Sequence, residues 1–360
     1  MPADISWDSD SAESSVKPKA KRPTVTDVAR LAGVGASTVS RCLRGNTNVS
    51  SAVAKRVSKA INELGYELDE NARALRVGRT RTIGVILPKI SNVFFSQSVQ
   101  QMEEEARQRG CTLIVLTHQD RMGQQLVHLA TLRRYRADGV IITCASGTTL
   151  QDVRSALPDV PILTFDSFLS AEVDSVLLNN REAARIATEH LLQHGYTSVA
   201  CVTGKPEVYS FQERAAGYAE VMVAHQLEPD LITAPDYEQL RSELAMRIKG
   251  TNRPAALLSL SDFATLNILT TFDELALARK DRLPFIGFDD FGFAPMVDPP
   301  LTVIRQPIAE MVSCALKMLF RRIDGIAPVG VQASAMPGEL ILRRSCGCCS
   351  EACRKVKGQA

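Results

Sequence analysis

The residues that decide the fold are Thr24-Val-Thr-Asp-Val-Ala-Arg-Leu-Ala-Gly-Val-Gly-Ala-Ser-Thr-Val-Ser-Arg41. Their apolar side chains recur every three or four positions, which is the spacing of one buried helix face. Thr24-x-x-Asp27 fits a capping box at the start of a first helix, and Gly33 suits its left-handed end. A second helix is expected over 36–44, and Ser50-Ser51 offers the N-cap of a third. Two helices joined by a tight glycine turn predict a helix-turn-helix, whose second helix enters the major groove of DNA.

The start of the second helix supplies the groups that would face DNA. Short hydroxyls near a helix N-terminus suit phosphate oxygens. Arg41 can donate two hydrogen bonds to a guanine, a contact worth about 1–3 kcal/mol of discrimination between bases. The predicted contacts from this helix are Ala36, Ser37, Thr38, Ser40 and Arg41.

The net charge of +2 hides a basic block near the amino end. Residues 1–16 contain four Asp or Glu and no Lys or Arg, whereas residues 17–82 contain fourteen Lys or Arg against five Asp or Glu, a charge of +9. Residues 83–360 therefore carry −3. A basic segment joined to a mildly acidic bulk is typical of a phosphate-binding module attached to a domain of another function. A solvated basic face is the alternative interpretation.

The 360 residues exceed what one hydrophobic core usually holds, so more than one domain is expected. Residues 1–22 are polar and are predicted to be a disordered arm ahead of a helix-turn-helix domain over 23–67. From Thr82 onward, short β-branched runs alternate with amphipathic stretches, which predicts parallel sheets covered by helices in an α/β domain over 82–345. Nine strands, enough for two sheets, are expected at 82–87, 112–117, 139–143, 161–165, 175–178, 198–203, 255–259, 284–288 and 301–304.

Nothing in the sequence predicts a membrane partner. No stretch approaches the ~18 consecutive apolar residues of a membrane helix. The polar, acidic amino end also differs from a signal peptide, which would be basic and then apolar. We therefore expect a cytoplasmic protein.

The pattern T-x-x-D-V-A-x-x-A-G-V-x-x-x-T-V-S-R resembles the DNA-binding headpiece of the LacI family of bacterial transcriptional regulators. The likeness continues through Asn48-Val-Ser50, Ile61-x-x-Leu-Gly-Tyr66 and Asn71-Ala-Arg-Ala-Leu75, and it spans about residues 23–344. It adds Thr24 and Asn48 to the predicted DNA contacts. It implies a small all-α headpiece and an α/β effector domain like the periplasmic sugar-binding proteins, with two Rossmann-like lobes joined by three crossings.

Residues 68–81 are expected to form a hinge helix and linker. The nine residues 69–77 could form a helix only against a partner, because isolated helices need about 12–15 residues in water. The resemblance implies that this helix folds on operator DNA and wedges Leu75 into the minor groove, with Ala72 and Arg73 beside it. An inert basic linker is the alternative. The chain departs from the family at Gly35, usually Ser, and at Leu68, usually Pro, which would alter a cap or phosphate contact and the rigidity of the hinge.

Polar residues that follow the predicted strands are the candidate effector ligands, because ligands of open α/β sheets lie beyond the carboxyl ends of the strands. Carboxylates, a forked arginine and an aromatic plate together suit a polyhydroxylated molecule. The resemblance supports part of this set and adds Gln306, and Ser261 stands where the family often has Asn. Taken singly, each of these residues could instead cap a helix or lie on the surface without binding a ligand. The predicted effector site comprises Asn92, Phe94, Phe95, Asp166, Arg214, Ser261, Asp289 and Gln306.

The resemblance implies a repressor that binds a palindromic operator as a homodimer and is controlled by a small molecule, such as a sugar, a sugar acid or a related metabolite. Whether the ligand induces or corepresses stays open. The alternatives are an architectural DNA binder without effector control and a sugar-acting enzyme. The sequence has no G-x-G-x-x-G after a strand, no P-loop and no G-x-S-x-G. No catalytic residue and no cofactor are predicted.

Nine cysteines are present, an odd number that argues against a disulfide framework. Five are scattered through apolar contexts and are expected to be small buried side chains. The other four, Cys346, Cys348, Cys349 and Cys353, lie beyond the usual family ending, here Leu340–Ser345. They could bind zinc or copper(I), but their spacing matches no established zinc knuckle. Residues 346–360 are therefore predicted to be a frayed cysteine-rich tail without metal.

Overall fold

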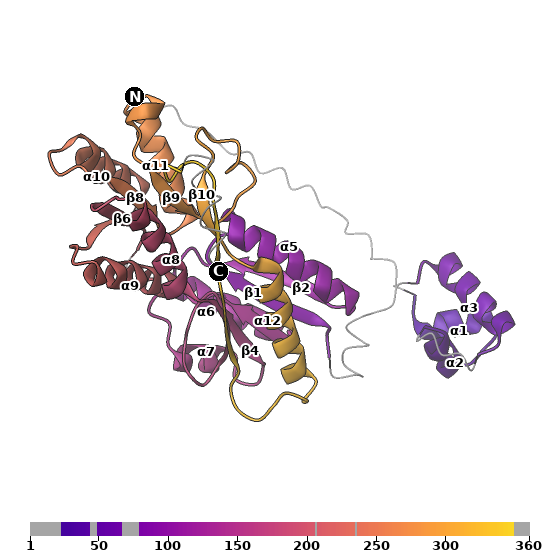
Figure 1. Cartoon of the computed structure of the whole chain (residues 1–360). Helices are drawn as coiled ribbons and strands as arrows, with labels where there is room; N and C mark the ends of the chain where they lie inside the picture. Colours follow the sequence, from indigo (N-terminus) through magenta and orange to yellow (C-terminus); the bar gives the residue numbers. More distant parts are fainter. Residues whose placement is uncertain (1–22, 44–48, 67–78, 206, 235, 349–360) are drawn as a thin grey trace, which may run out of the picture. The chain divides into compact units, whose positions relative to one another are not determined.

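The computed structural model describes residues 23–43, 49–66, 79–205, 207–234 and 236–348. The chain divides into two compact units, one ending at residue 77 and the other beginning at residue 78. The first is an all-α headpiece and the second is a larger α/β domain (Figure 1). Among the described helices, none is both long and apolar enough to span a membrane.

The headpiece contains the three predicted helices, α1 Val25–Ala32, α2 Ala36–Leu43 and α3 Ser51–Leu64. The predicted capping box is present, because the hydroxyl of Thr24 accepts the N–H of Asp27 at 3.3 Å while the Asp27 carboxylate accepts the N–H of Thr24 at 3.0 Å. Gly33 ends α1 with a φ of 63°. Ser50 occupies the N-cap position of α3 but makes no side-chain capping bond. The headpiece core joins all three helices through Val28, Val39 and Val57.

The α/β domain contains two six-stranded sheets, and each defines a lobe. The first has the order β11-β5-β4-β3-β1-β2, and the second has the order β12-β10-β9-β8-β6-β7. All pairings are parallel except that of β10 with β12. The strands of the first sheet are β1 Thr82–Leu87, β2 Thr112–Thr117, β3 Gly139–Ile142, β4 Ile162–Phe165, β5 Asp174–Leu178 and β11 Ala333–Met336. Those of the second are β6 Val199–Thr203, β7 Asp230–Thr233, β8 Ala256–Ser259, β9 Phe285–Phe288, β10 Thr302–Arg305 and β12 Glu339–Ile341.

Helices cover both faces of each sheet. In the first lobe, Val85 packs with α5 Val93–Gln108 and α12 Ile308–Ile323, whereas its neighbour Ile86 packs on the other face with α6 Met122–Arg134 and α7 Leu150–Ala156. This alternation follows from the two-residue period of a strand. The second lobe is covered in the same way by α8 Asn180–Gln193 and α9 Tyr209–Ala224 on one face and by α10 Tyr237–Lys249 and α11 Asp262–Glu274 on the other.

The chain passes between the lobes three times, after β5, after β10 and after β11. The number of crossings implied by the family resemblance is therefore confirmed. The five leading strands have the same order in both lobes, β2-β1-β3-β4-β5 and β7-β6-β8-β9-β10. The lobes are thus structural duplicates, although no internal repeat is visible in the sequence.

Of the twelve strands among the described residues, nine coincide with the predicted runs to within one residue at either end, and β7, β11 and β12 were not predicted. These three are short edge strands with half-exposed residues. β11 has the sequence Ala-Ser-Ala-Met, which contains no β-branched residue. Pairing with an existing sheet, rather than intrinsic propensity, makes these segments strands.

Helices α8 and α9 pack closely because Gly217 brings the two backbones together. A Cβ at this position would collide with the carbonyl oxygen of Arg181 on α8, and a carbonyl cannot move aside as a flexible side chain can. We predict that Gly217→Ala lowers the free energy of unfolding of the α/β domain by about 1–3 kcal/mol, the usual cost of overpacking. Urea denaturation followed by circular dichroism measures this loss.

Gly123→Ala is the matched control, because Gly123 lies in α6 with no heavy atom near its Cβ position. That substitution should leave stability unchanged or raise it, since Ala has the higher helix propensity. Equal stability of the two variants would contradict the close approach of α8 and α9.

Candidate DNA-binding surface and effector site

The recognition helix α2 exposes one face and buries the other. Ala36, Ser37 and Arg41 are exposed, and Thr38 and Ser40 are half-buried on either side of the fully buried Val39. Nε of Arg41 donates to the carbonyl oxygen of Ser37 at 3.4 Å, so the side chain lies back along its own helix. Three of the predicted contacts on α2 are therefore exposed, and the other two lie at the edges of the buried face. Asn48, Ala72, Arg73 and Leu75 lie outside the described residues.

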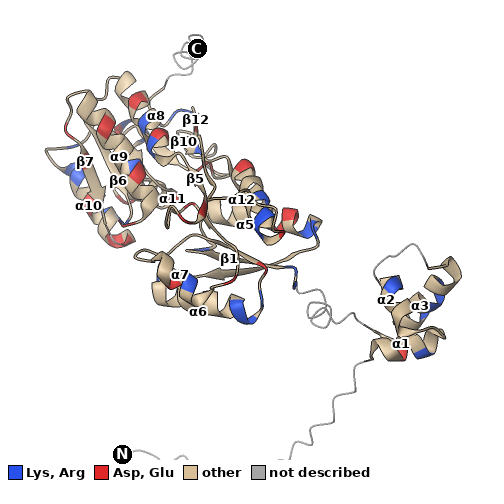
Figure 2. Ribbon diagram, turned by 90° about the horizontal axis from the view of Figure 1, so that it is seen from below, with Lys and Arg blue, Asp and Glu red and all other residues tan. Residues whose placement is uncertain are grey.

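Basic residues predominate on the headpiece (Figure 2). Its described residues include five Lys or Arg, all exposed, against two Asp or Glu. Thr24 has its hydroxyl in the capping box, where it donates to the Asp27 carboxylate at 2.7 Å. At Gly35 an added Cβ would lie 3.7 Å from the hydroxyl of Ser37, so the space for the usual family serine is present.

Two aspartates occupy the same position in the two lobes. Asp166 directly follows β4 and Asp289 directly follows β9, and each N–H donates to the next strand, to Val176 at 3.0 Å and to Ile304 at 2.9 Å. Both residues have a left-handed backbone, with φ of 53° and 66°. This conformation is uncommon for residues other than glycine and is concentrated at functional sites. The two carboxylates are also buried.

Arg214 of α9 is the cation of the site and is only 2% exposed. Its Nε donates to Oδ1 of Asn180 at 2.7 Å, and its Nη1 donates to the carbonyl oxygen of Leu260 at 2.7 Å. The guanidinium carbon lies 3.7 Å from the ring centroid of Phe288. These contacts use two of the five N–H donors of arginine, so the remainder can bind a ligand.

Burial dominates the electrostatics of the site. It raises the pKa of Asp166 to about 6, against the opposing charge of Arg214. It raises the pKa of Asp289 to about 7, and the nearby charge of Asp262 adds to that rise. Burial also lowers the pKa of Arg214, although all three carboxylates oppose that shift. The four groups therefore share one electrostatic environment, in which the carboxylates outnumber the cation.

Several buried polar atoms at this site have no hydrogen-bond partner, among them Oδ1 of Asp166, Oε1 of Gln306 and Nδ2 of Asn180. The other end of the Gln306 amide donates to Asp289 at 2.7 Å. A cavity of about 240 Å³ is lined by Phe94, Asp289 and Gln306, together with Val93, Gln97, Asp290, Arg305 and Ile308. Asp166, Asn180 and Arg214 are not among its lining residues. An unsatisfied buried polar atom beside a cavity, here that of Gln306, is typical of a ligand site, because it costs free energy until a partner arrives.

The chain matches two families of known proteins. Residues 24–68 match the bacterial regulatory proteins of the lacI family, and residues 188–346 match a periplasmic binding protein-like domain. The HTH-type transcriptional repressor PurR of Vibrio campbellii is 31% identical over 306 residues, which cover 83% of this chain and 92% of that protein. The chain belongs to the LacI family.

Solved structures agree with this assignment. The Lac repressor dimer bound to operator and the anti-inducer ONPF has a TM-score of 0.80 at 25% identity, covering 91% of this chain and 99% of that one. The Lac repressor bound to ONPG has a TM-score of 0.79 at 25% identity, covering 90% and 100%. This member of the LacI family is thus a DNA-binding transcriptional regulator and not an enzyme.

The predicted effector residues of this LacI-family protein have different roles in the structure. Asn92 and Ser261 are helix caps: Oδ1 of Asn92 accepts the N–H of Phe95 at 3.0 Å, and the hydroxyl of Ser261 accepts the N–H of Ala264 at 3.1 Å. Phe95 is buried edge-on against Phe94, with ring centroids 5.1 Å apart. The capping role that the sequence left as an alternative is therefore present for two residues. Phe94, Asp166, Arg214, Asp289 and Gln306 supply the aromatic, charged and amide groups of the site.

The sequence prediction missed Asn180 as a site residue, and it left Asp262 out of the effector set although Asp262 also follows the predicted strand at 255–259. Asn180 comes just after β5 and holds Arg214, so the rule of polar residues beyond strand ends would have included it. Burial raises the pKa of Asp262, and Asn92 and the N–H of Val93 oppose that rise by hydrogen bonding to it from the other lobe. A second link between the lobes joins Lys205 and Asp120 at 2.8 Å.

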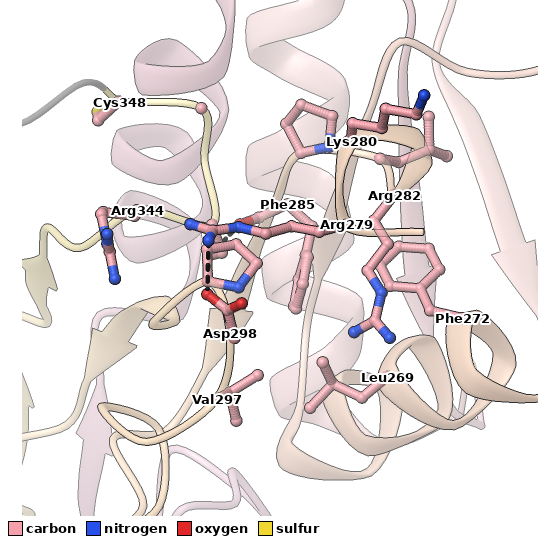
Figure 3. A pocket seen from close by; sticks show the side chains of 15 residues that line it. Leu269, Phe272, Arg279, Lys280, Arg282, Phe285, Val297, Asp298, Arg344 and Cys348 are labelled. Carbon is pink, nitrogen blue, oxygen red and sulfur yellow. Dashed lines mark hydrogen bonds and ion pairs between the residues drawn. The ribbon is translucent and has the colours of Figure 1, made fainter. Parts of the chain in front are cut away.

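A larger concavity of about 770 Å³ lies elsewhere in the second lobe (Figure 3). Its polar lining is mainly cationic, with Arg279, Lys280, Arg282 and Arg344, and Arg279 pairs with Asp298 at 3.2 Å. It contains none of the predicted effector residues. The smaller cavity is the better effector site, because the unsatisfied buried atom of Gln306 and the strained Asp289 both line it.

The raised pKa of Asp289 gives a test of its burial. A carboxyl whose pKa rises on folding, here from 3.8 to about 7, keeps its proton more firmly in the folded state. Its contribution to stability therefore falls as pH rises from about 4 to 7. The free energy of unfolding of the wild type should therefore fall between pH 5 and pH 8. We predict that this fall is smaller in Asp289→Asn, by on the order of 2 kcal/mol.

Urea denaturation of both proteins at the two pH values measures this difference, and other titrating groups cancel in the comparison. Asp159→Asn, at an exposed position, is the control and should keep the wild-type pH dependence. Identical pH dependence of Asp289→Asn and the wild type would contradict the burial of this carboxyl.

Proposed function

We propose that this chain represses transcription by binding a palindromic operator as a homodimer, and that a sugar or sugar acid in the cleft between the lobes sets its affinity for DNA. The observation that carries this proposal is the buried group of Asp166, Asp289 and Arg214, with polar atoms that lack partners, in a chain that also contains a helix-turn-helix. The DNA-binding unit and the ligand site are separate, as an allosteric regulator requires.

The chemistry of the cleft favours a ligand that donates many hydrogen bonds. Asp166, Asp262 and Asp289 face one arginine, so hydroxyl groups of a sugar would find several acceptors. Phe94 stacks on Phe165 with centroids 5.6 Å apart and offers an apolar surface beside the polar groups. Arg214 favours the second candidate, a sugar acid, because its unused donors suit a carboxylate.

A ligand in the cleft would contact both lobes. Phe94 and Asp166 belong to the first lobe, whereas Arg214 and Asp289 belong to the second. A molecule that bridges these groups binds more tightly when the lobes are close together, so it shifts the population toward the closed arrangement. In a dimer, rotation of the lobes would change the spacing of the two headpieces, and the spacing of half-sites is what an operator selects.

The base-reading role of Arg41 gives a direct test of DNA binding. We predict that Arg41→Ala lowers affinity for the operator by about 10- to 100-fold, while affinity for random duplex stays nearly constant, because base contacts specify and phosphate contacts position. The operator is first selected from random DNA with the wild-type protein, and binding is then measured by fluorescence anisotropy at fixed salt.

Arg30→Ala is the matched control, since Arg30 is an exposed headpiece arginine on α1. This substitution should lower the affinity for operator and for random DNA by the same factor, or leave both affinities unchanged. If Arg41→Ala lost the same affinity on operator and random DNA, the recognition role would be refuted.

The ligand role of Asp166 is tested by thermal shift with a panel of sugars and sugar acids, since a ligand of the folded state raises the melting temperature. We predict that Asp166→Asn binds the effector roughly 10- to 100-fold more weakly, because a hydrogen bond to a charged group is lost. Its affinity for operator without effector should remain that of the wild type.

Asp159→Asn again serves as the control and should bind the effector normally. Operator affinity measured with and without the effector distinguishes an inducer from a corepressor. If no member of the panel raised the melting temperature or changed operator affinity, effector control by this class would be ruled out and an architectural DNA binder would be favoured.

A further inference from the structure

The end of the described chain is not a frayed tail. Cys346 is fully buried and Cys348 is 5% exposed, and both belong to the core that packs against α8. The expectation of fraying from residue 346 is therefore wrong for these two residues, because the thiols fill space beneath the second sheet. Cys349 and Cys353 lie outside the described residues.

The two thiols meet two histidines that lie four residues apart near the end of α8, His190 and His194. The four ligand atoms all lie within 4.8 Å of one another. Gly347 makes this arrangement possible, because its φ is 87° and a Cβ there would collide with the hydroxyl of Tyr196. A glycine between the cysteines thus lets both thiols face the histidine pair.

Hydrogen bonds alone cannot satisfy this cluster. Nε2 of His190 lies 3.2 Å from Nε2 of His194, 3.4 Å from Sγ of Cys346 and 3.5 Å from Sγ of Cys348. An imidazole nitrogen carries either one proton or one lone pair, so it makes one good hydrogen bond and not three. Nε2 of His190 therefore has three close neighbours but can form a good hydrogen bond with only one of them.

We propose that His190, His194, Cys346 and Cys348 form a structural zinc site that fastens the carboxyl-terminal segment to α8. Two imidazoles and two thiolates are a preferred ligand set for tetrahedral Zn²⁺, and four protein ligands close the coordination sphere. The site shares no residue with the effector cleft, and its test does not depend on the proposed repressor function.

The observed separations resemble the edges of such a tetrahedron. With ordinary Zn–N and Zn–S bond lengths, ligand atoms should be about 3.3 Å apart for two nitrogens, about 3.5 Å for nitrogen and sulfur, and about 3.8 Å for two sulfurs. The two nitrogens are 3.2 Å apart, and three of the four nitrogen–sulfur distances are 3.0 to 3.5 Å. The fourth, between His194 and Cys346, is within 4.8 Å. The two sulfurs, at 3.1 Å, would separate as the ion enters. That distance is far longer than the ~2.05 Å of a disulfide bond.

The sulfur of Cys346 also has a hydrogen-bond donor outside the cluster. The hydroxyl of Thr302 accepts the N–H of Arg343 at 2.9 Å and donates its own proton to Sγ of Cys346 at 3.2 Å. A hydrogen bond donated to sulfur is a common outer-shell feature of metal sites. The concavity of Figure 3 reaches Cys348 and gives an ion access from solvent.

The test uses the full chain, purified after expression with added zinc. Elemental analysis after desalting should find stoichiometric zinc, and chelation should lower the melting temperature. Cobalt added to the metal-free protein should give the visible absorption of tetrahedral Co²⁺ and a thiolate-to-cobalt charge-transfer band. His194→Ala and Cys348→Ser should each lose stoichiometric zinc and the tetrahedral cobalt spectrum, with circular dichroism showing whether they remain folded.

Cys314→Ser is the matched control, because Cys314 is a half-buried thiol of the first lobe on α12. It should keep both zinc and the cobalt spectrum. The proposal would be overturned by wild-type protein without stoichiometric metal, by a Cys346–Cys348 disulfide in the purified chain, or by retention of metal in the two site variants. Loss of metal in Cys353→Ser with retention in His194→Ala would assign the ion to the tail thiols instead and would equally overturn it.

Discussion

The buried guanidinium of Arg214 is the constraint on which the effector domain depends. It joins three parts of the second lobe, because it bonds to Asn180 on α8 and to Leu260 after β8 and stacks on Phe288 of β9. A cation in this position costs several kcal/mol unless charges of opposite sign accompany it. Asp166 and Asp289 supply that charge from strand ends of both lobes. The carboxylates in turn lose their hydration, which is why burial raises their pKa values.

The same balance explains why the site suits a ligand. Three carboxylates against one arginine leave an excess of acceptors in a region that water reaches poorly. Hydroxyl groups can donate to these acceptors without adding charge, whereas an anion must rely on Arg214 alone. The uncommon backbone at Asp166 and Asp289 serves this arrangement, because it turns both side chains at the point where their strands end.

Much of the fold and part of the candidate site could be predicted from the sequence, because these features depend on local sequence patterns. Apolar periodicity and the capping box gave the three headpiece helices, and β-branched runs gave the central strands. The rule that ligands lie beyond strand ends selected Asp166 and Asp289 as candidates, and both are buried within electrostatic reach of Arg214. The edge strands β11 and β12 could not be predicted in this way, because their residues become strands only by pairing with a sheet. Asn92 and Ser261 were predicted as effector ligands from the same rule, but in the structure both side chains cap helices. There the local capping role, which the sequence had left as an alternative, is the one observed.

The cysteine and histidine cluster was missed for a different reason. The sequence interpretation considered only the spacing of the thiols among themselves, whereas their partners lie more than 150 residues earlier, as for His190 and Cys346. The local signal was present in two histidines four residues apart on one helix face, but only the tertiary fold brings that face to the thiols.

Helix α8 connects the two sites of the second lobe. Its first residue, Asn180, holds Arg214 at the effector cleft, and His190 in its last turn and His194 at its C-cap belong to the cysteine cluster. Fourteen helical residues span about 21 Å, so both ends move as one rigid body. The close approach at Gly217 fixes the middle of α8 against α9, which itself carries Arg214. An ion that fastens the far end of α8 would therefore restrict one of the elements that hold Arg214, so the carboxyl-terminal segment and the effector site are both packed against the same helix.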